Sequence, residues 1–172
     1  RASSLVIVGD LFDFWFEYKK VVPRGYTRLL GRLAEITDSG VPVHFFTGNH
    51  DIWVFDYLPT ETGVIVHRHP IEMNLGSKRF YLAHGDGLGG FDKKFILLKA
   101  LFTNKFAQWL FSHIHPNLGI GIANIWSKRS RESNLAKYGS VYLGDDREWL
   151  VLYAKQVLAK EHYDYFVFGH RH

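Results

Sequence analysis

The sequence predicts an α/β fold with its functional side chains at the ends of strands. Short apolar runs, typical of buried strands, alternate with segments in which apolar residues recur every three or four positions, as in amphipathic helices. Open α/β sheets bind ligands at the carboxyl ends of their strands. Four of the apolar runs are followed directly by residues that can bind a metal ion. We expect the site to form from these four motifs: Gly9-Asp10, Gly48-Asn49-His50-Asp51, His84-Gly85-Asp86 and Gly169-His170-Arg171-His172.

The composition is that of a globular protein. The 172 residues are 47% hydrophobic and 22% charged, which suffices for one main domain with an insertion. The absence of cysteine excludes disulfides and thiolate zinc sites, and leaves oxygen and imidazole as metal ligands, for which ten histidines are available. No signal peptide is visible, and no apolar run approaches the roughly 18 residues needed to span a bilayer. We therefore expect a cytoplasmic protein, soluble or peripheral to a membrane.

Basic charge is concentrated in one segment. Residues 91–137 contain eight lysines and arginines against two acids, a net charge of +6, whereas the rest of the chain carries −2. The segment is also rich in Phe, Leu and Trp, and such a surface can face nucleic acid, phosphorylated substrates or an anionic membrane. Nucleic acid is the least expected partner, because the basic residues share their helices with large apolar ones and form no recognised motif.

The first unit is predicted to be strand, helix, strand. Residues 5–8 form the first strand, apolar residues between Tyr26 and Ile36 recur at helical spacing, and residues 43–47 form the second strand. A crossover helix joins parallel neighbours, so Asp10 and Asn49 are expected at the same edge of the sheet. In the alternative interpretation, Asp10 lies in an ordinary turn and caps a following helix.

The turn after the second strand carries more chemistry than a turn requires. A turn needs Gly and one Asn or Asp, whereas Asn49-His50-Asp51 supplies a neutral oxygen ligand, a titratable ring and an anion to orient that ring. This cluster predicts a functional role for the turn.

The central part of the chain is predicted to be more antiparallel. Residues 64–67, 71–74 and 80–82 are expected as short strands, with a hairpin turn at residues 75–78. His67 and His69 precede a proline and are interpreted as exposed strand-end residues. His84 lies between an alanine and a glycine, which leave room for a metal ion, and it is the better ligand candidate.

The basic segment is predicted to be helical. Apolar residues at helical spacing indicate one amphipathic helix over residues 91–110, which His113-Ile114-His115-Pro116 breaks, and a second over residues 122–138. Core packing within a helical subdomain is the favoured interpretation of the apolar stripe, ahead of membrane insertion. A last helix over residues 149–157 leads to the final strand at residues 165–168.

The residue types at the four strand ends suit a pair of metal ions. Two divalent cations about 3.5 to 4 Å apart need a bridging carboxylate together with oxygen and imidazole ligands from several loops. A mixed set of this kind suits Mn²⁺, iron or zinc better than calcium. Asp10 can bridge, and the further candidate ligands are Asn49, His84, His170 and His172.

In this order, the four motifs resemble those of the calcineurin-like metallophosphoesterase superfamily over the whole chain. The resemblance implies an αββα sandwich, two divalent ions and hydrolysis of a phosphoester or phosphoanhydride by metal-activated water. It also implies that Asp10 bridges the ions, that Asn49, His84 and His170 complete one site, and that His172 joins the other.

The resemblance also supplies a catalytic pair. His50, oriented by Asp13, is implied to protonate the leaving group or to stabilise negative charge.

One element of the superfamily pattern does not occur on the first strand of this sequence: the Asp-x-His that supplies two ligands of the second ion. We therefore expect a protein truncated at both ends. The expected organisation is a first part of the core at residues 1–90, a helical cap insertion at residues 91–145 and the last part of the core at residues 146–172. An Asp-x-His upstream of Arg1 would favour an enzyme over a non-catalytic scaffold that binds a partner.

The cap makes the chain most similar, within the superfamily, to the enzymes that cleave the pyrophosphate of UDP-2,3-diacylglucosamine in lipid A synthesis. Those enzymes contact substrate through an Asp eight residues after the His of His-Gly-Asp, and through a Ser, an Asn and a Lys further along. Together with Asn49, His50 and His170, the implied substrate contacts here are Asp92, Ser130, Asn134 and Lys137.

Other substrates stay open, because many of these enzymes have Arg where this chain has His50. The alternatives are another nucleotide phosphodiester, a phosphomonoester or a phosphoprotein. The lipid-linked nucleotide is favoured, since lysines beside phenylalanines suit an acyl chain joined to a phosphate. It also implies peripheral binding at the cytoplasmic face of the inner membrane.

Overall fold

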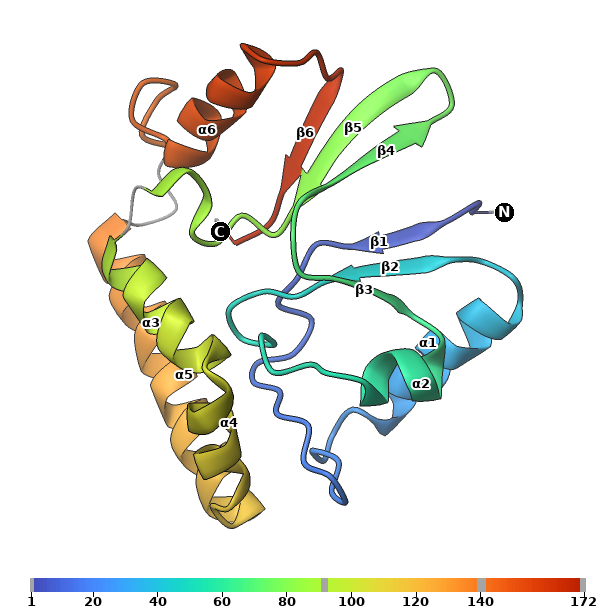
Figure 1. The fold of residues 1–172 in the computed structure, drawn as a ribbon, viewed down its shortest axis with the longest axis vertical. Coiled ribbons are helices and arrows are strands. Elements are labelled where there is room, and N and C mark those ends of the chain that lie inside the picture. The colour runs from blue at the N-terminus through green and yellow to red at the C-terminus, as the bar shows by residue number, and fades with distance from the viewer. Residues whose placement is uncertain (1, 91–92, 139–141, 171–172) are drawn as a thin grey trace.

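The computed structural model describes residues 2–90, 93–138 and 142–170, in which six strands form two three-stranded sheets (Figure 1). The first sheet is parallel and has the order β1-β2-β3, with bounds Leu5–Ile7, Val43–Phe46 and Ile65–His67. The second has the order β4-β5-β6, antiparallel between β4 and β5 and parallel between β5 and β6, with bounds Ile71–Leu75, Lys78–Ala83 and Tyr165–Phe168. The predicted α/β fold is thus confirmed.

Helices cover both sheets. α1 (Thr27–Asp38) and α2 (Tyr57–Thr62) pack against the first sheet, where Leu33 and Leu58 join Phe45 in a buried core. α6 (Trp149–Leu158) covers the second sheet, and its Tyr153 packs in the cluster around Tyr81. In Figure 1 the two sheets lie one above the other between these helices. This layering places the carboxyl ends of β1, β2, β5 and β6 in one region.

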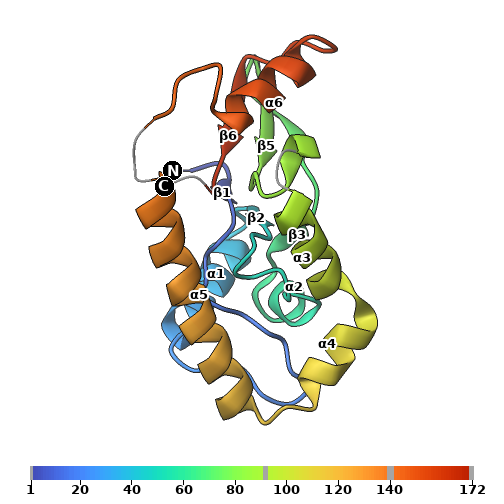
Figure 2. The same cartoon turned by 90° about the vertical axis from the view of Figure 1, so that its left-hand side faces the viewer.

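Three further helices, which we call the cap, lie beside these strand ends: α3 (Lys93–Thr103), α4 (Lys105–Ser112) and α5 (Pro116–Tyr138). A short 3₁₀ turn, Leu88–Gly90, precedes them. Figure 2 shows α3 and α4 on one side of the strand ends and α5 on the other. The Trp53 indole donates a hydrogen bond of 2.6 Å to the Phe102 carbonyl, and its ring lies 4.7 Å from that of Phe111. The cap is therefore fixed to the segment that follows the Asn49 turn.

The single helix predicted over residues 91–110 is two helices. Asn104 has an extended backbone, and its side-chain oxygen accepts hydrogen bonds from the main-chain N–H of Phe106 and Ala107, at 2.9 and 3.1 Å. This is an N-cap, which ends α3 and starts α4. α5 begins at Pro116, earlier than the predicted residue 122, with the proline at the first helical position, where a main-chain N–H is not needed.

The predicted antiparallel arrangement is correct for the β4-β5 hairpin and wrong for β3. β3 pairs in parallel with β2, and His44 lies opposite Ile65. The reason is α2, a six-residue helix that contains Pro59 and returns the chain to the same edge of the sheet. A helix this short shows no apolar periodicity and obtains its stability from tertiary contacts, so the sequence pattern did not predict it.

Glu17 fixes the start of α2. Its carboxylate accepts hydrogen bonds from the main-chain N–H of Asp56, Tyr57 and Leu58, at 2.8, 3.1 and 3.3 Å. The first turn of a helix leaves such donors without partners, and its positive dipole end also favours a carboxylate. The loop after β1 is thereby joined to the segment after β2.

Replacing Glu17 with Ala should lower the free energy of unfolding by about 1.5 to 3 kcal/mol, because it removes hydrogen bonds to a charged acceptor. Urea denaturation of the full-length protein measures the change. The matched control is Glu35→Ala, whose carboxylate pairs with Arg32 on the exposed face of α1 and should contribute less than about 1 kcal/mol. Equal losses in the two variants would contradict this role of Glu17.

Candidate metal centre

Four loops that follow parallel strands bring their side chains to one place. Asp10 follows β1, Asn49 follows β2, His84 follows β5 and His170 follows β6. Asp10, His84 and His170 each offer one ligand atom, and these atoms lie within 4.8 Å of one another. The Asn49 side-chain oxygen lies 3.4 Å from His84 Nε2. The structure therefore brings together the four side chains expected to bind one ion.

His84 is oriented for metal binding by the opposite sheet. Its Nδ1 lies 2.7 Å from the Val8 carbonyl, so Nδ1 carries the proton and Nε2 faces Asp10 Oδ2 at 3.3 Å. A hydrogen bond of this kind fixes the ring and its tautomer in metal sites. Burial alone would lower the pKa of His84, but the hydrogen bond and the charge of Asp10 outweigh it, and the pKa lies above the usual value.

Asp10 and His170 are in the protonation states that a metal requires at neutral pH. Burial would raise the pKa of Asp10, but the hydrogen bond and charge of His84 and the His50 N–H, 3.0 Å from Asp10 Oδ1, keep it below the usual value. Burial and the neighbouring His84 lower the pKa of His170 to about 4, which leaves a neutral imidazole. Asp10 is thus ionised and His170 is neutral.

The backbone around these ligands is in unusual conformations. Among the described residues, Asp10 and His170 are the two non-glycine residues with positive φ, at 51° and 66°. Such conformations persist where the surrounding structure requires them, often at functional sites. Gly9 has φ of 92°, and a Cβ at this position would lie 2.7 Å from His84 Cγ. The close packing of the β1 turn against His84 therefore requires glycine.

Asp51 was predicted to orient the His50 ring, but the structure shows that it joins two loops instead. It is fully buried, and its two oxygens accept hydrogen bonds from the main-chain N–H of Leu11, at 2.8 Å, and of Gly48, at 2.5 Å. Burial and the neighbouring Asp10 charge raise the pKa of Asp51 to about 7. Asp51 thus fixes the turn after β2 against the turn after β1.

His50 is oriented by the cap. Its Nδ1 lies 2.7 Å from the Ser127 hydroxyl and 3.1 Å from the Asp13 main-chain carbonyl, to which the Ser127 hydroxyl donates at 2.9 Å. Nδ1 therefore carries the proton and Nε2 is the acceptor. The predicted partner Asp13 contacts His50 through its main-chain carbonyl. Ser127, which is buried on α5, was not predicted from the sequence. Ser127 and His50 are 77 positions apart, so no local sequence pattern indicated their contact.

The remaining predicted site residues are not placed relative to the cluster. Asp92 and His172 lie outside the described residues. Asn134 and Lys137 are positions of α5 whose side chains lie outside the described part of the chain, and Ser130 is half-buried on the same helix. His69 is exposed, as expected, and His67 is half-buried, with Nε2 2.9 Å from His44 Nδ1.

The calcineurin-like phosphoesterase family matches residues 2–172. A UDP-2,3-diacylglucosamine hydrolase of Porphyromonas gingivalis is 41% identical over 183 residues, which cover the whole chain and 70% of that protein. Proteins with the same name from Edwardsiella ictaluri and Vibrio vulnificus are 29% and 30% identical over 80% and 66% of this chain. The chain spans 52% and 46% of those two relatives, about half their length.

Replacing Asp10 with Asn, or His84 with Ala, should weaken Mn²⁺ binding by at least about tenfold. Substituting a residue that only hydrogen-bonds to a metal ligand already weakens metal affinity by about this amount, and loss of the ligand itself should cost no less. Metal analysis of the full-length protein after equilibrium dialysis measures the effect. The control Asp38→Asn removes an exposed carboxylate at the end of α1 and should leave Mn²⁺ binding unchanged. Full metal content in both site variants would contradict the assignment of these ligands.

Proposed function

This chain belongs to the calcineurin-like phosphoesterase family, and we propose that it hydrolyses the pyrophosphate bond of UDP-2,3-diacylglucosamine in lipid A biosynthesis. The products are UMP and 2,3-diacylglucosamine 1-phosphate. The observation that carries the proposal is the meeting of one carboxylate, one amide oxygen and two imidazoles at the strand ends of both sheets. The P. gingivalis relative, whose name states this substrate, supports it.

The ligand set fits a divalent ion, as the family requires. Asp10, Asn49, His84 and His170 would hold one ion, and Asp10 and His172 would contribute to a second. Their mixture of oxygen and nitrogen donors favours Mn²⁺, with iron or zinc as alternatives. When bound, such ions supply Lewis acidity to the phosphoryl oxygens and lower the pKa of water to generate the nucleophile.

His50 is the residue that would act on the leaving group. Its ring is fixed by the Ser127 hydroxyl and the Asp13 carbonyl, and its main-chain N–H donates a hydrogen bond to the Asp10 carboxylate. Protonated at Nε2, it would donate to the leaving oxygen or stabilise the charge that develops there. Asp13 and Ser127 act on this step by positioning the ring.

The face of α5 that carries Ser127 is the proposed substrate-binding face. Ser127 contacts His50, so this face points toward the candidate centre. Ser130, Asn134 and Lys137 follow Ser127 by three, seven and ten positions, and ideal helix geometry puts these positions within about 80° of Ser127 around the axis, on the same side of the helix. Asp92, Asn49, His50 and His170 would provide the other substrate contacts.

A different phosphoester is the second candidate. His50, where many enzymes with the favoured substrate carry Arg, is the observation that supports another nucleotide phosphodiester or a phosphomonoester. The two candidates differ in whether Ser130, Asn134 and Lys137 contact the substrate, because a small ester bound at the centre would not extend along α5.

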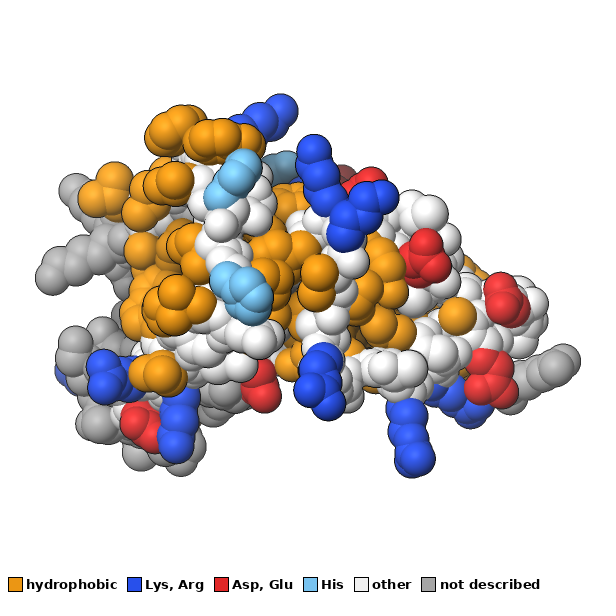
Figure 3. Space-filling model, turned by 90° about the horizontal axis from the view of Figure 1, so that it is seen from below, with side chains coloured by type: hydrophobic (Ala, Val, Ile, Leu, Met, Phe, Trp, Pro, Cys, Tyr) orange, Lys and Arg blue, Asp and Glu red, His pale blue; other side chains and the backbone are white. Residues whose placement is uncertain are grey.

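The cap also supports peripheral binding to an anionic membrane at the cytoplasmic face. No helix in the described ranges is long and apolar enough to cross a membrane. Leu97 and Phe106 nevertheless leave 74% and 69% of their surfaces exposed, and Figure 3 shows hydrophobic side chains with Lys and Arg around them over the left part of the molecule, where the cap lies. Exposed apolar patches of this kind mark interaction surfaces. A lipid-linked substrate is delivered at such a surface.

Replacing Lys137 with Ala should lower kcat/KM for UDP-2,3-diacylglucosamine by roughly 10- to 100-fold, the loss of one charge-assisted contact of about 1.5 to 3 kcal/mol. Phosphorus NMR of the products formed by the full-length, Mn²⁺-loaded protein measures turnover. The same variant should hydrolyse bis-p-nitrophenyl phosphate at nearly the wild-type rate. The control Lys160→Ala changes a lysine that follows α6 and should leave hydrolysis of both substrates nearly unchanged.

Equal losses on both substrates in the Lys137 variant would assign this lysine to fold stability. Rapid cleavage of the small ester by the wild type, with none of the lipid nucleotide, would favour the second candidate.

Replacing Phe106 with Ser should reduce binding to anionic vesicles about tenfold, because one large apolar side chain contributes about 1.5 to 3 kcal/mol on burial. Vesicle flotation measures the bound fraction, which should also fall as the salt concentration rises. The control Leu158→Ser changes an exposed leucine at the end of α6 and should have no effect. Binding that is insensitive to salt and to Phe106→Ser would contradict docking through the cap.

A further inference from the structure

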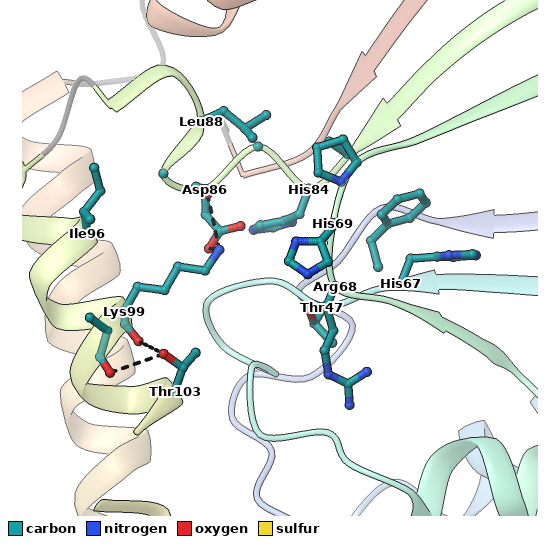
Figure 4. Close-up of a pocket in the computed structure, with 16 residues that line it drawn as sticks. Thr47, His67, Arg68, His69, His84, Asp86, Leu88, Ile96, Lys99 and Thr103 are labelled. Atoms are coloured by element: carbon teal, nitrogen blue, oxygen red, sulfur yellow. Dashed lines mark hydrogen bonds and ion pairs between the residues drawn. The ribbon is translucent and has the colours of Figure 1, made fainter. Parts of the chain in front are cut away.

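A pocket of about 420 Å³ opens between the candidate metal centre and α3 (Figure 4). Residues 67–70, which connect β3 to β4, form one wall, and α3 forms the other. His84 lines the pocket where it meets the metal centre. α3 and α5 lie on two sides of the strand ends (Figure 2), so this pocket and the Ser127 face of α5 approach the centre from different sides. A substrate with two parts joined by a pyrophosphate needs two such binding regions.

The lining of the pocket mixes apolar side chains, such as Leu88 and Ile96, with charged and imidazole groups. The Lys99 ammonium reaches from α3 to the buried Asp86 carboxylate, 2.6 Å away, and Figure 4 shows His69 on the opposite wall. Arg68 fixes that wall, because its guanidinium donates to the Val54 carbonyl at 2.7 Å. An acyl chain in this pocket would remove water from an ion pair and several imidazoles without replacing their hydrogen bonds, which is costly. The pocket therefore suits a ligand with a flat apolar face and polar edges better than an acyl chain.

The groups that line it complement a pyrimidine nucleoside. A uracil ring has two carbonyl acceptors and one N–H donor, and the pocket offers the Lys99 ammonium as donor and the Asp86 carboxylate as acceptor. The exposed His69 imidazole offers a flat surface on which a base can stack. The volume lies within the range of about 300 to 1,000 Å³ that is usual for small-molecule sites. A phosphate bound at the metal centre would leave the attached nucleoside at the mouth of this pocket, beside His84.

We propose that this pocket binds the nucleoside of the UMP half of the substrate, with His69 stacked on the base and Lys99 donating to a base carbonyl. The inference rests on the proposed function and deepens it, because it assigns the two halves of the substrate to different sides of the centre. The sugar and acyl chains then lie toward α5 and the exposed apolar surface of the cap. His69 and Lys99 determine specificity for the nucleotide.

Calorimetric titration of the full-length, Mn²⁺-loaded protein with UMP tests the proposal without turnover. His69→Ala should raise the dissociation constant of UMP about tenfold, and His69→Phe, which restores a flat ring, should return it to within about twofold of the wild type. Lys99→Met should also raise it, and Lys99→Arg should restore part of the affinity. His69 is exposed, so its replacement leaves the fold intact.

Two controls separate the pocket from the metal centre. Glucose 1-phosphate, which has the phosphate without the base, should bind the wild type and His69→Ala equally. His115→Ala removes an exposed imidazole before α5 and should leave UMP binding unchanged.

Equal UMP affinity in the wild type, His69→Ala and Lys99→Met would overturn the proposal, and a loss of UMP affinity in Ser130→Ala instead would assign the nucleoside to α5. If UMP binding shows the expected calorimetric pattern but the protein does not cleave UDP-2,3-diacylglucosamine, the nucleoside site is supported and the lipid substrate is rejected. The two proposals can therefore fail separately.

Discussion

The candidate site depends on one hydrogen bond between the two sheets, from the His84 ring to the Val8 carbonyl. His84 follows β5 of the second sheet, and Val8 follows β1 of the first, so this 2.7 Å contact joins the sheets at the edge where their parallel strands end. It also leaves Nε2 facing Asp10, Asn49 and His170. Gly9 is necessary for the same reason, since any side chain there would occupy the space of the ring. The cross-sheet contact and the metal-binding geometry are thus one feature.

Two neighbouring carboxylates divide the remaining tasks. Asp10 is stabilised in its ionised form by His84 and the His50 N–H, which suits a metal ligand. Asp51 is buried deeper, has a pKa raised to about 7 and connects the turns after β1 and β2 through two main-chain N–H groups. Like charges in one buried region push their pKa values apart. Asp51 therefore positions the loops, and Asp10 is the carboxylate of the pair that is available to bind a metal ion.

The sequence predicted what depends on local pattern and strand direction. Parallel pairing through a crossover helix requires Asp10 and Asn49 to share an edge, and the apolar runs located all six strands. What it missed depends on contacts between distant residues. The Ser127–His50 contact, the Glu17 cap of α2 and the pairing of β3 all join segments that no local periodicity relates. The break at Asn104 was missed because the apolar spacing continues across it.

Strand ends from both sheets bring four candidate metal ligands to one place. Anomalous diffraction from crystals of the full-length protein grown with Mn²⁺ tests most directly the claim that they form one ligand set. We predict a peak at about 2.0 to 2.3 Å from a side-chain atom of each of Asp10, Asn49, His84 and His170, the range usual for nitrogen and oxygen ligands. Peaks found only at surface carboxylates, with none at these four side chains, would contradict the claim.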